Sequence, residues 1–160
     1  MFGLGKKEKI FVVCAPMNGV AKHIEDVEDE AFREKLLGDG AAVIPDSGEI
    51  FSPVSGVIAD ITDTKHAFCI TTDDEADVLL HVGINTVNLK GEGFRVFVKP
   101  GDRVVAGDKL AEVELSLLKT HKMPLDTPVV LTESEKYEVI KVAAGELRGG
   151  CDTLFTYRKR

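Results

Sequence analysis

The sequence predicts an all-β protein, an antiparallel β-sandwich with one or two short helices. Short apolar stretches alternate with Gly, Pro, Asp and Asn along the whole chain, among them KIFVVCAP, GAAVIP, HAFCITT, DVLLHVGINTV, FRVFVKPGD, TPVVLT and YEVIKVA. Many short strands joined by turns are typical of a sandwich or a barrel. An internal repeat and the scarcity of helical patterns favour the same class.

The repeat joins residues 15–26, APMNGVAKHIED, with residues 52–63, SPVSGVIADITD. Proline, glycine, valine, isoleucine and aspartate match in order and without a gap. Since proline is excluded from a central ladder and glycine favours turns, the two segments predict equivalent strand–turn–strand corners. A chance similarity between two turn-rich segments is the alternative explanation.

Residues 28–38, EDEAFREKLLG, form the one convincing helical pattern. Acidic residues open it, Phe32, Leu36 and Leu37 recur at helical spacing, and Gly38 can end it. Residues 114–120, ELSLLKT, allow one further turn. A chain of 160 residues suits one core, so we expect a single domain over 9–160 after a flexible segment, 1–8.

Composition excludes several classes of protein. Lys and Arg number 20 against 27 Asp and Glu, and the net charge of -7 argues against nucleic-acid binding and favours partners with basic faces. Cys14, Cys69 and Cys151 have no metal-like spacing, and the first two are predicted as core residues in a reducing cytosol. Without a signal peptide or an apolar span, the chain is predicted to be cytoplasmic, with at most peripheral membrane contact.

Period-two alternation in ADVLLHVGINTV places His81 on the strand face that carries Leu79 and Gly83. The opposite, core face holds Val78, Leu80, Val82, Ile84 and Thr86. A histidine beside an exposed apolar residue and a bare glycine indicates a docking surface with a reactive centre. A hydrogen-bonded structural histidine explains the pattern equally well.

His66 lies at the start of another strand, on the face of Phe68, with Thr64 two residues away. The Thr64 hydroxyl could bond an imidazole nitrogen and fix its tautomer. Taken alone, His66 fits a structural role better than a functional one. A hairpin could nevertheless bring His66 beside His81. The remaining histidines, His23 and His121, have polar neighbours and are predicted to lie at the surface.

Residues 79–94, LLHVGINTVNLKGEGF, with TKHAF at 64–68, resemble the glucose-type IIA phosphocarriers of the bacterial phosphoenolpyruvate:sugar phosphotransferase system. PVSGVI, AFREKLLGDG, PGDRVVAGDKL and TPVVLT are similar to family segments in the same order. The resemblance implies a sandwich of the barrel-sandwich, duplicated hybrid type. It also implies a phosphotransferase component that accepts phosphate from phospho-HPr on a histidine and passes it to a cysteine of a permease IIB domain. Some relatives, when unphosphorylated, regulate permeases or metabolic enzymes.

The resemblance implies that His81 is phosphorylated, that His66 supports the phosphoryl group and that Thr64 orients His66. No cofactor is required for such a transfer. For His81 to attack through Nε2, its Nδ1–H needs an acceptor, and the carbonyl near Gly83 is well placed for that role.

The family's partner-docking positions form a hydrophobic rim with an acidic residue close to it. In this chain they are Phe32, Leu36, Leu37 and Leu79, with Asp29 as the acid. Asn85 stands where family members have aspartate, which makes this site less negative and predicts altered partner affinity. Thr62 and Cys69 replace bulkier apolar residues and would trim the rim.

Two other classes remain as alternatives. KPGDRVVAGDKLAEVEL resembles half of a lipoyl or biotinyl carrier domain, although no acceptor lysine stands at a hairpin tip. A zinc hydrolase on a related scaffold would need His-x-His and an aspartate, and residue 83 is glycine. A zinc ion could still bridge His66 and His81 if a partner carboxylate completed the site.

Overall fold

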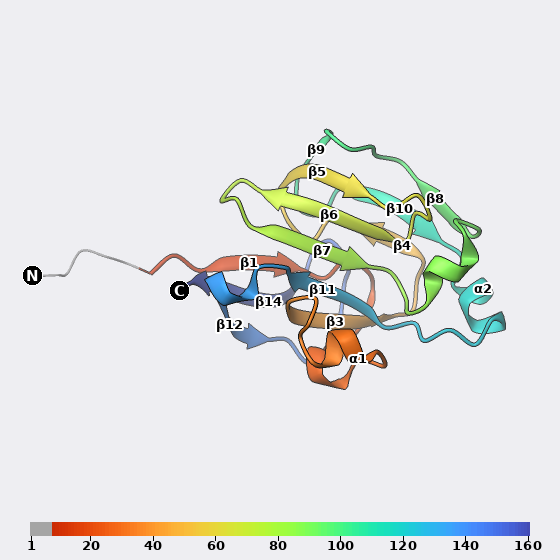
Figure 1. Cartoon of the computed structure of the whole chain (residues 1–160), viewed down its shortest axis with the longest axis horizontal. Helices are drawn as coiled ribbons and strands as arrows, with labels where there is room; N and C mark the ends of the chain where they lie inside the picture. Colours follow the sequence, from red (N-terminus) through yellow and green to blue (C-terminus); the bar gives the residue numbers. More distant parts are fainter. Residues whose placement is uncertain (1–7) are drawn as a thin grey trace, which may run out of the picture.

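The computed structural model describes residues 8–160 and is built mainly of short antiparallel strands (Figure 1). The strands are β1 (Phe11–Cys14), β2 (Gly19–His23), β3 (Asp39–Pro45), β4 (Glu49–Phe51), β5 (Gly56–Ile61), β6 (Ala67–Thr72), β7 (Asp77–His81), β8 (Phe94–Val96), β9 (Arg103–Val104), β10 (Lys109–Val113), β11 (Thr127–Leu131), β12 (Tyr137–Val142), β13 (Glu146–Leu147) and β14 (Thr153–Lys159). Two α-helices, α1 (Glu30–Arg33) and α2 (Leu115–Thr120), and three 3₁₀ turns, η1 (Ile24–Asp26), η2 (Thr86–Leu89) and η3 (Ser134–Lys136), complete it.

The strands form three sheets. The large sheet has the order β13-β2-β3-β11-β7-β6-β5-β9, and β1-β14-β12 and β4-β10-β8 form two smaller ones. All pairings between the described strands are antiparallel. The predicted antiparallel sandwich with short helices is therefore confirmed.

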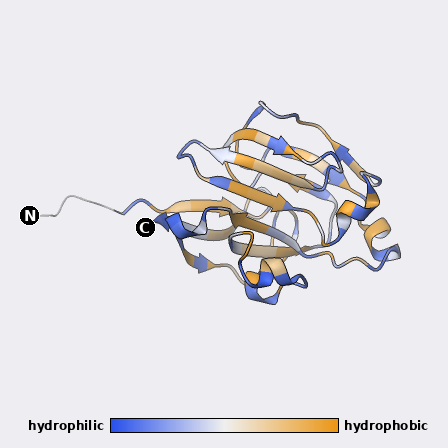
Figure 2. Cartoon of the chain, in the orientation of Figure 1, coloured by the Kyte–Doolittle hydropathy of each residue, from blue (hydrophilic) through white to orange (hydrophobic). Residues whose placement is uncertain are grey.

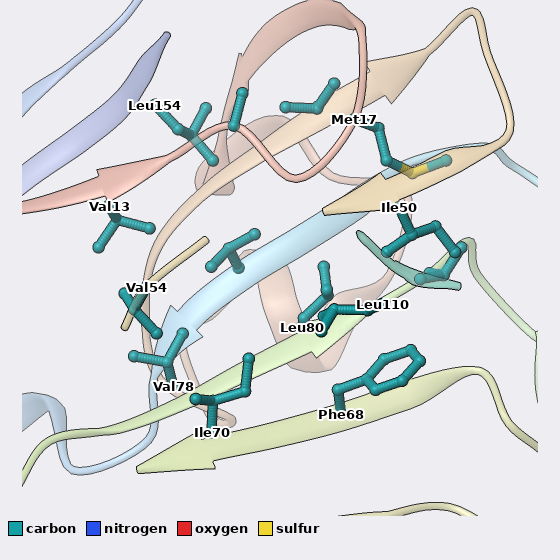
Figure 3. Close-up of a cluster of buried hydrophobic side chains, with 14 of the residues drawn as sticks. Val13, Met17, Ile50, Val54, Phe68, Ile70, Val78, Leu80, Leu110 and Leu154 are labelled. Carbon is teal, nitrogen blue, oxygen red and sulfur yellow. The ribbon is translucent and has the colours of Figure 1, made fainter. Parts of the chain in front are cut away.

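One large apolar cluster fills the space between the sheets. It takes side chains from all three, including Val13, Phe68, Leu80, Leu110 and Leu154 (Figure 3). Apolar residues recur along the strands while the turns are hydrophilic, as Figure 2 shows. Burying such side chains contributes roughly 25 cal/mol per Å² of apolar surface, which makes this cluster the main source of stability.

The two repeat segments occupy equivalent positions, as the sequence predicted. The residue before each segment donates its backbone N–H to the proline of the other segment, Cys14 to the Pro53 carbonyl at 2.8 Å and Phe51 to the Pro16 carbonyl at 2.7 Å. The strands within the two segments, β2 and β5, each pair on one side with a two-residue strand, β13 and β9 respectively. The repeat is therefore a structural duplication rather than a chance similarity.

The first helix is shorter than the sequence predicted. A helix over 28–38 ending at Gly38 is wrong, because α1 covers only Glu30–Arg33 and the chain turns at Lys35. Lys35 has a left-handed φ of 61°, and the Leu36 N–H bonds to the Ala31 carbonyl at 2.9 Å. This is a Schellman end, in which a non-glycine residue takes the position that usually favours glycine. The second predicted turn is confirmed as α2.

Strand β7 departs from strict alternation at its end. Val78, Leu80 and Val82 enter the large cluster as predicted. Ile84 is also buried, but in a second cluster with Phe32, because β7 ends at His81 and the chain reverses at Gly83 (φ 74°). Period two applies only while the backbone stays extended.

The second cluster covers the outer face of the large sheet under η1 and α1. Its buried members are Ile24, Val27, Phe32, Ala42, Ile84 and Val130, with Leu79 packed against them.

The expected flexible segment, 1–8, lies outside the described residues except for Glu8. Its flexibility and the single-domain boundary at residue 9 stay predictions.

Replacing Gly56 by alanine should destabilise the fold. A Cβ there would overlap the Thr71 carbonyl of the neighbouring strand, as one at Gly19 would overlap the Ile44 carbonyl. We expect Gly56→Ala to lower the free energy of unfolding by about 2 kcal/mol or more, because backbone is harder to displace than a side chain. Urea unfolding of the variant and the parent protein measures this change in the free energy of unfolding.

Val57→Ala, at an exposed position of the same strand, is the control and should cost about 1 kcal/mol or less. Equal losses for the two variants would contradict a steric role for Gly56.

Candidate functional site

Two imidazoles meet at one end of the β6–β7 pair. Ala67 lies directly opposite His81 in the register of these strands, and His66 immediately precedes Ala67. The ring centroids of His66 and His81 lie 4.8 Å apart at an interplanar angle of 79°. The His66 carbonyl also accepts the Val82 N–H at 2.8 Å, which fixes the two segments to each other. The hairpin that the sequence allowed therefore brings both histidines together.

The ring of His81 is held through Nδ1. This atom lies 2.7 Å from the Gly83 carbonyl oxygen, and because a carbonyl only accepts, Nδ1 carries the proton. In the neutral ring Nε2 then has a free lone pair. Gly83 can make this approach because it adopts a positive φ, and a Cβ there would press against Thr86 and Leu118. The sequence prediction for the Gly83 carbonyl is borne out by this geometry.

Two hydroxyls converge on Nδ1 of His66. Thr64 Oγ1 lies 2.7 Å away, as predicted, and Thr62 Oγ1 lies 3.4 Å away. Thr62 also accepts the Ala67 N–H at 3.1 Å. A hydroxyl that donates to Nδ1 leaves the imidazole proton on Nε2. Sequence reasoning treated Thr62 only as a smaller rim residue, because the turn that returns it to His66 has no local signature.

Burial keeps both rings neutral. Desolvation and the nearby His81 lower the pKa of His66 from 6.5 to about 4, and only 6% of the residue is exposed. Desolvation also lowers the pKa of His81, opposed by its bond to the Gly83 carbonyl and by the charge of Asp29. Near pH 7 the site therefore offers one nitrogen with a free lone pair and one N–H donor.

Helix α1 forms a wall beside His81. The Phe32 ring lies edge-on to the His81 ring, with centroids 5.2 Å apart. Asp29 caps the helix by accepting the Phe32 N–H at 3.1 Å. Phe32 was expected on an exposed rim, but it is only 2% exposed, so that expectation is wrong. Its ring supports His81 from within the second cluster rather than meeting solvent.

The exposed apolar surface comes from other residues. Leu36 is 73% exposed and Leu37 41%, both just after α1, whereas Leu79 is half-buried against the second cluster. Val87, in η2 directly after the His81 loop, is also exposed. Sequence reasoning missed Val87, because it follows the point at which alternation ends. Asn85 is exposed and has a left-handed φ of 65°.

The other two histidines lie at the surface. His23 and His121 are exposed, at the ends of β2 and α2, as predicted. Cys14 and Cys69 are half-buried rather than fully in the core, and burial raises the pKa of both thiols.

Within residues 8–160 no group of three or more His, Cys, Asp and Glu side chains could hold a metal ion. The two histidines would supply only part of a zinc site, so the zinc bridge stays a prediction that needs a ligand from a partner. In the same range no helix is long and apolar enough to span a membrane.

Known proteins are similar to this chain in both sequence and fold. Residues 11–137 match the family model of the phosphoenolpyruvate-dependent sugar phosphotransferase system, EIIA 1. The glucose-specific EIIA component of Halalkalibacterium halodurans is 42% identical, covering 99% of this chain and 96% of that protein. That of Bacillus cereus is 40% identical over 91% and 88%. The structure of glucose permease IIA from Mycoplasma capricolum superposes with a TM-score of 0.86 at 37% identity, covering 98% and 99%.

The fold and the matching family define a phosphoryl carrier of sugar uptake. The chain belongs to the EIIA 1 family of the phosphoenolpyruvate-dependent sugar phosphotransferase system. The lipoyl carrier and zinc hydrolase alternatives are thereby set aside.

The stability of the protein should fall as the pH falls from 6.5 towards 4. The unfolded state protonates His66 near pH 6.5 and the folded state only near its pKa of about 4, so the unfolded chain binds more protons in this window. The contribution of His66 is present above pH 6.5, and roughly 3 kcal/mol or less is lost by pH 4. Urea unfolding of the protein and of His66→Gln, each at pH 7 and 4.5, isolates this contribution. Equal pH dependence in the two proteins would contradict it.

Removing the hydroxyl of Thr62 or of Thr64 should lower the share of the His66 tautomer that carries its proton on Nε2. We expect Thr64→Val to raise the share of the other tautomer more than Thr62→Val, because the Thr64 contact is shorter. Imidazole nitrogen chemical shifts measured by NMR report the tautomer directly. An unchanged His66 spectrum in Thr64→Val would show that the hydroxyl does not select it.

Proposed function

We propose that His81 carries the phosphoryl group. Its Nε2 attacks the phosphorus of a phosphohistidine on HPr, so a new N–P bond forms while the donor's N–P bond breaks and the donor imidazole leaves. The observation that carries the proposal is the 2.7 Å bond from Nδ1 to the Gly83 carbonyl. It holds the proton away from Nε2 and aims the free lone pair of a neutral ring.

The second transfer reverses the roles. A thiolate on the IIB domain of a sugar permease attacks the phosphorus, an S–P bond forms, and the N–P bond at His81 breaks. The bond to Gly83 keeps Nδ1 protonated, which makes the departing imidazole a good leaving group. One side chain can therefore accept the phosphoryl group and release it again.

His66 supports the group during both transfers. With Nδ1 in contact with the Thr64 hydroxyl and its ring next to that of His81, its Nε2–H can donate to the equatorial oxygens, where negative charge accumulates. A donor of this kind typically contributes about 3 kcal/mol to transition-state stabilisation, on the order of a hundredfold in rate. Its low pKa makes it a neutral donor in the resting protein.

Docking uses the exposed leucines after α1 together with the acidic surface. Leu36 and Leu37 present apolar side chains beside the wall that carries Phe32. The net charge of -7 attracts partners with basic faces and speeds their encounter. Asn85 lies exposed beside the His81 loop and makes the site less negative than an aspartate would. We place the protein in the cytoplasm. From the names of its relatives, we propose that the permease it serves is of the glucose type.

Phosphorylation should add one acid-labile phosphate at His81. The protein is incubated with phosphoenolpyruvate, Enzyme I and HPr, and intact-mass and peptide mass spectrometry locate the group. His81→Ala is the negative control, and His23→Ala, at an exposed position, should be labelled like the parent protein. A phosphate found on another residue would contradict the assignment.

His66→Gln should still accept phosphate but pass it to IIB about a hundredfold more slowly, because the amide can donate a hydrogen bond but, unlike imidazole, cannot become charged as negative charge develops on the phosphoryl oxygens. Single-turnover transfer from the phosphorylated variant to IIB measures this rate. An unimpaired rate would remove the supporting role of His66.

A further inference from the structure

Asp126 is a buried charge that the proposed transfer does not use. Its side chain is 4% exposed, and Oδ2 accepts both the Lys22 ammonium at 2.9 Å and the Glu28 backbone N–H at 3.0 Å. Lys22 lies on β2, and Glu28 lies between η1 and α1. One oxygen of Asp126 therefore binds two groups that each lie about a hundred residues earlier in the sequence.

This pair is poorly explained as a device for stability. Desolvating two charges costs about as much as their attraction returns, and an apolar pair of similar size is often as stable. The carboxylate does tie together the segments that it contacts, because one oxygen bonds to both Lys22 and the Glu28 backbone. The segment at issue here leads directly into the wall of the candidate site.

Three contacts lead from Asp126 to that wall. The carboxylate fixes the Glu28 N–H, the next residue, Asp29, caps α1 through the Phe32 N–H, and the Phe32 ring packs against His81. Arg33 Nη1 also donates to the Val27 carbonyl at 3.2 Å, which closes the segment on itself. The exposed Leu36 and Leu37 follow on the same short stretch of chain.

The residues around Asp126 contact the opposite side of the site as well. The Pro124 carbonyl accepts the Ile84 N–H at 3.0 Å, and Thr127 Oγ1 accepts the Gly83 N–H at 3.4 Å. Residues 124–127, the β11 entry segment, thus form hydrogen bonds both to the loop after His81 and to Glu28, just before α1.

We propose that Asp126 is a positioning residue, which sets α1 and its leucines at the distance from His81 that a docking protein requires. The inference rests on the proposed function and adds to it a residue that does not touch the phosphoryl group. Asp126 should therefore govern partner binding rather than the transfer step, since the bond between His81 and Gly83 does not pass through its side chain.

Asp126→Ala should raise the KM for phospho-HPr about tenfold and change kcat by about twofold or less. Without the bond to Glu28, the docking-competent placement of α1 is populated only part of the time, and apparent affinity falls by that fraction. Asp126→Asn keeps the volume and one acceptor for Glu28, so its KM should lie between those of the parent protein and Asp126→Ala. If Asp126→Ala does not fold, the KM of Asp126→Asn for phospho-HPr tests the proposal in its place.

Asp102→Ala is the matched control. Asp102 also accepts a backbone N–H, that of Lys99 at 2.9 Å, and pairs with the Lys99 ammonium at 3.2 Å. It precedes β9, at the far edge of the large sheet from β13, and β5 and β6 separate β9 from β7. We expect its KM to match that of the parent protein. A KM that is unchanged in a folded Asp126 variant, or that rises equally in Asp102→Ala, overturns the proposal.

Amide hydrogen exchange separates this proposal from the proposed function. Loss of protection at Glu28 and Phe32 in Asp126→Ala, absent from Asp102→Ala, supports the positioning role whether or not HPr is a donor. Retained protection at both amides overturns it. A parent protein that accepts no phosphate from HPr would count against the proposed function alone, and the exchange result would still decide the role of Asp126.

Discussion

The register between β6 and β7 is the constraint on which the site depends. Ala67 opposite His81 places His66, one residue earlier, with its ring 4.8 Å from that of His81. The same register pairs Phe68 with Leu80 on the core face. A slip of one residue would move Leu80 out of the core, so the apolar cluster and the histidine pair are fixed by one arrangement.

The site balances two opposing demands. The proposed transfer needs a neutral His81, and burial on the face that carries α1 favours the neutral form by lowering the pKa of this ring. A phosphoryl carrier must also be reached by other proteins, so the ring cannot be sealed. Phe32 packs edge-on and leaves His81 half-buried, whereas the leucines after α1 remain at the surface.

Duplication supplies the scaffold, and divergence after each copy supplies the site. The segments at 15–26 and 52–63 form equivalent corners joined by reciprocal hydrogen bonds. The first ends in η1, and the chain continues into α1, which forms the wall. In the second, β5 leads into the turn with Thr62 and Thr64, whose hydroxyl oxygens lie 3.4 and 2.7 Å from Nδ1 of His66. The wall and His66 thus follow equivalent places in the two halves.

The sequence alone determined the antiparallel class, the direction of His81 and the partners of both rings through Thr64 and Gly83, because alternation and short-range hydrogen bonding are local properties. It overestimated α1 and misplaced Phe32 and Ile84, because helix length and burial depend on which surface covers a residue. Only the tertiary structure brought the Thr62 hydroxyl to His66 and Asp126 to Glu28, since a backbone reversal makes the first contact and strand order the second. Neither leaves a periodic trace in the chain.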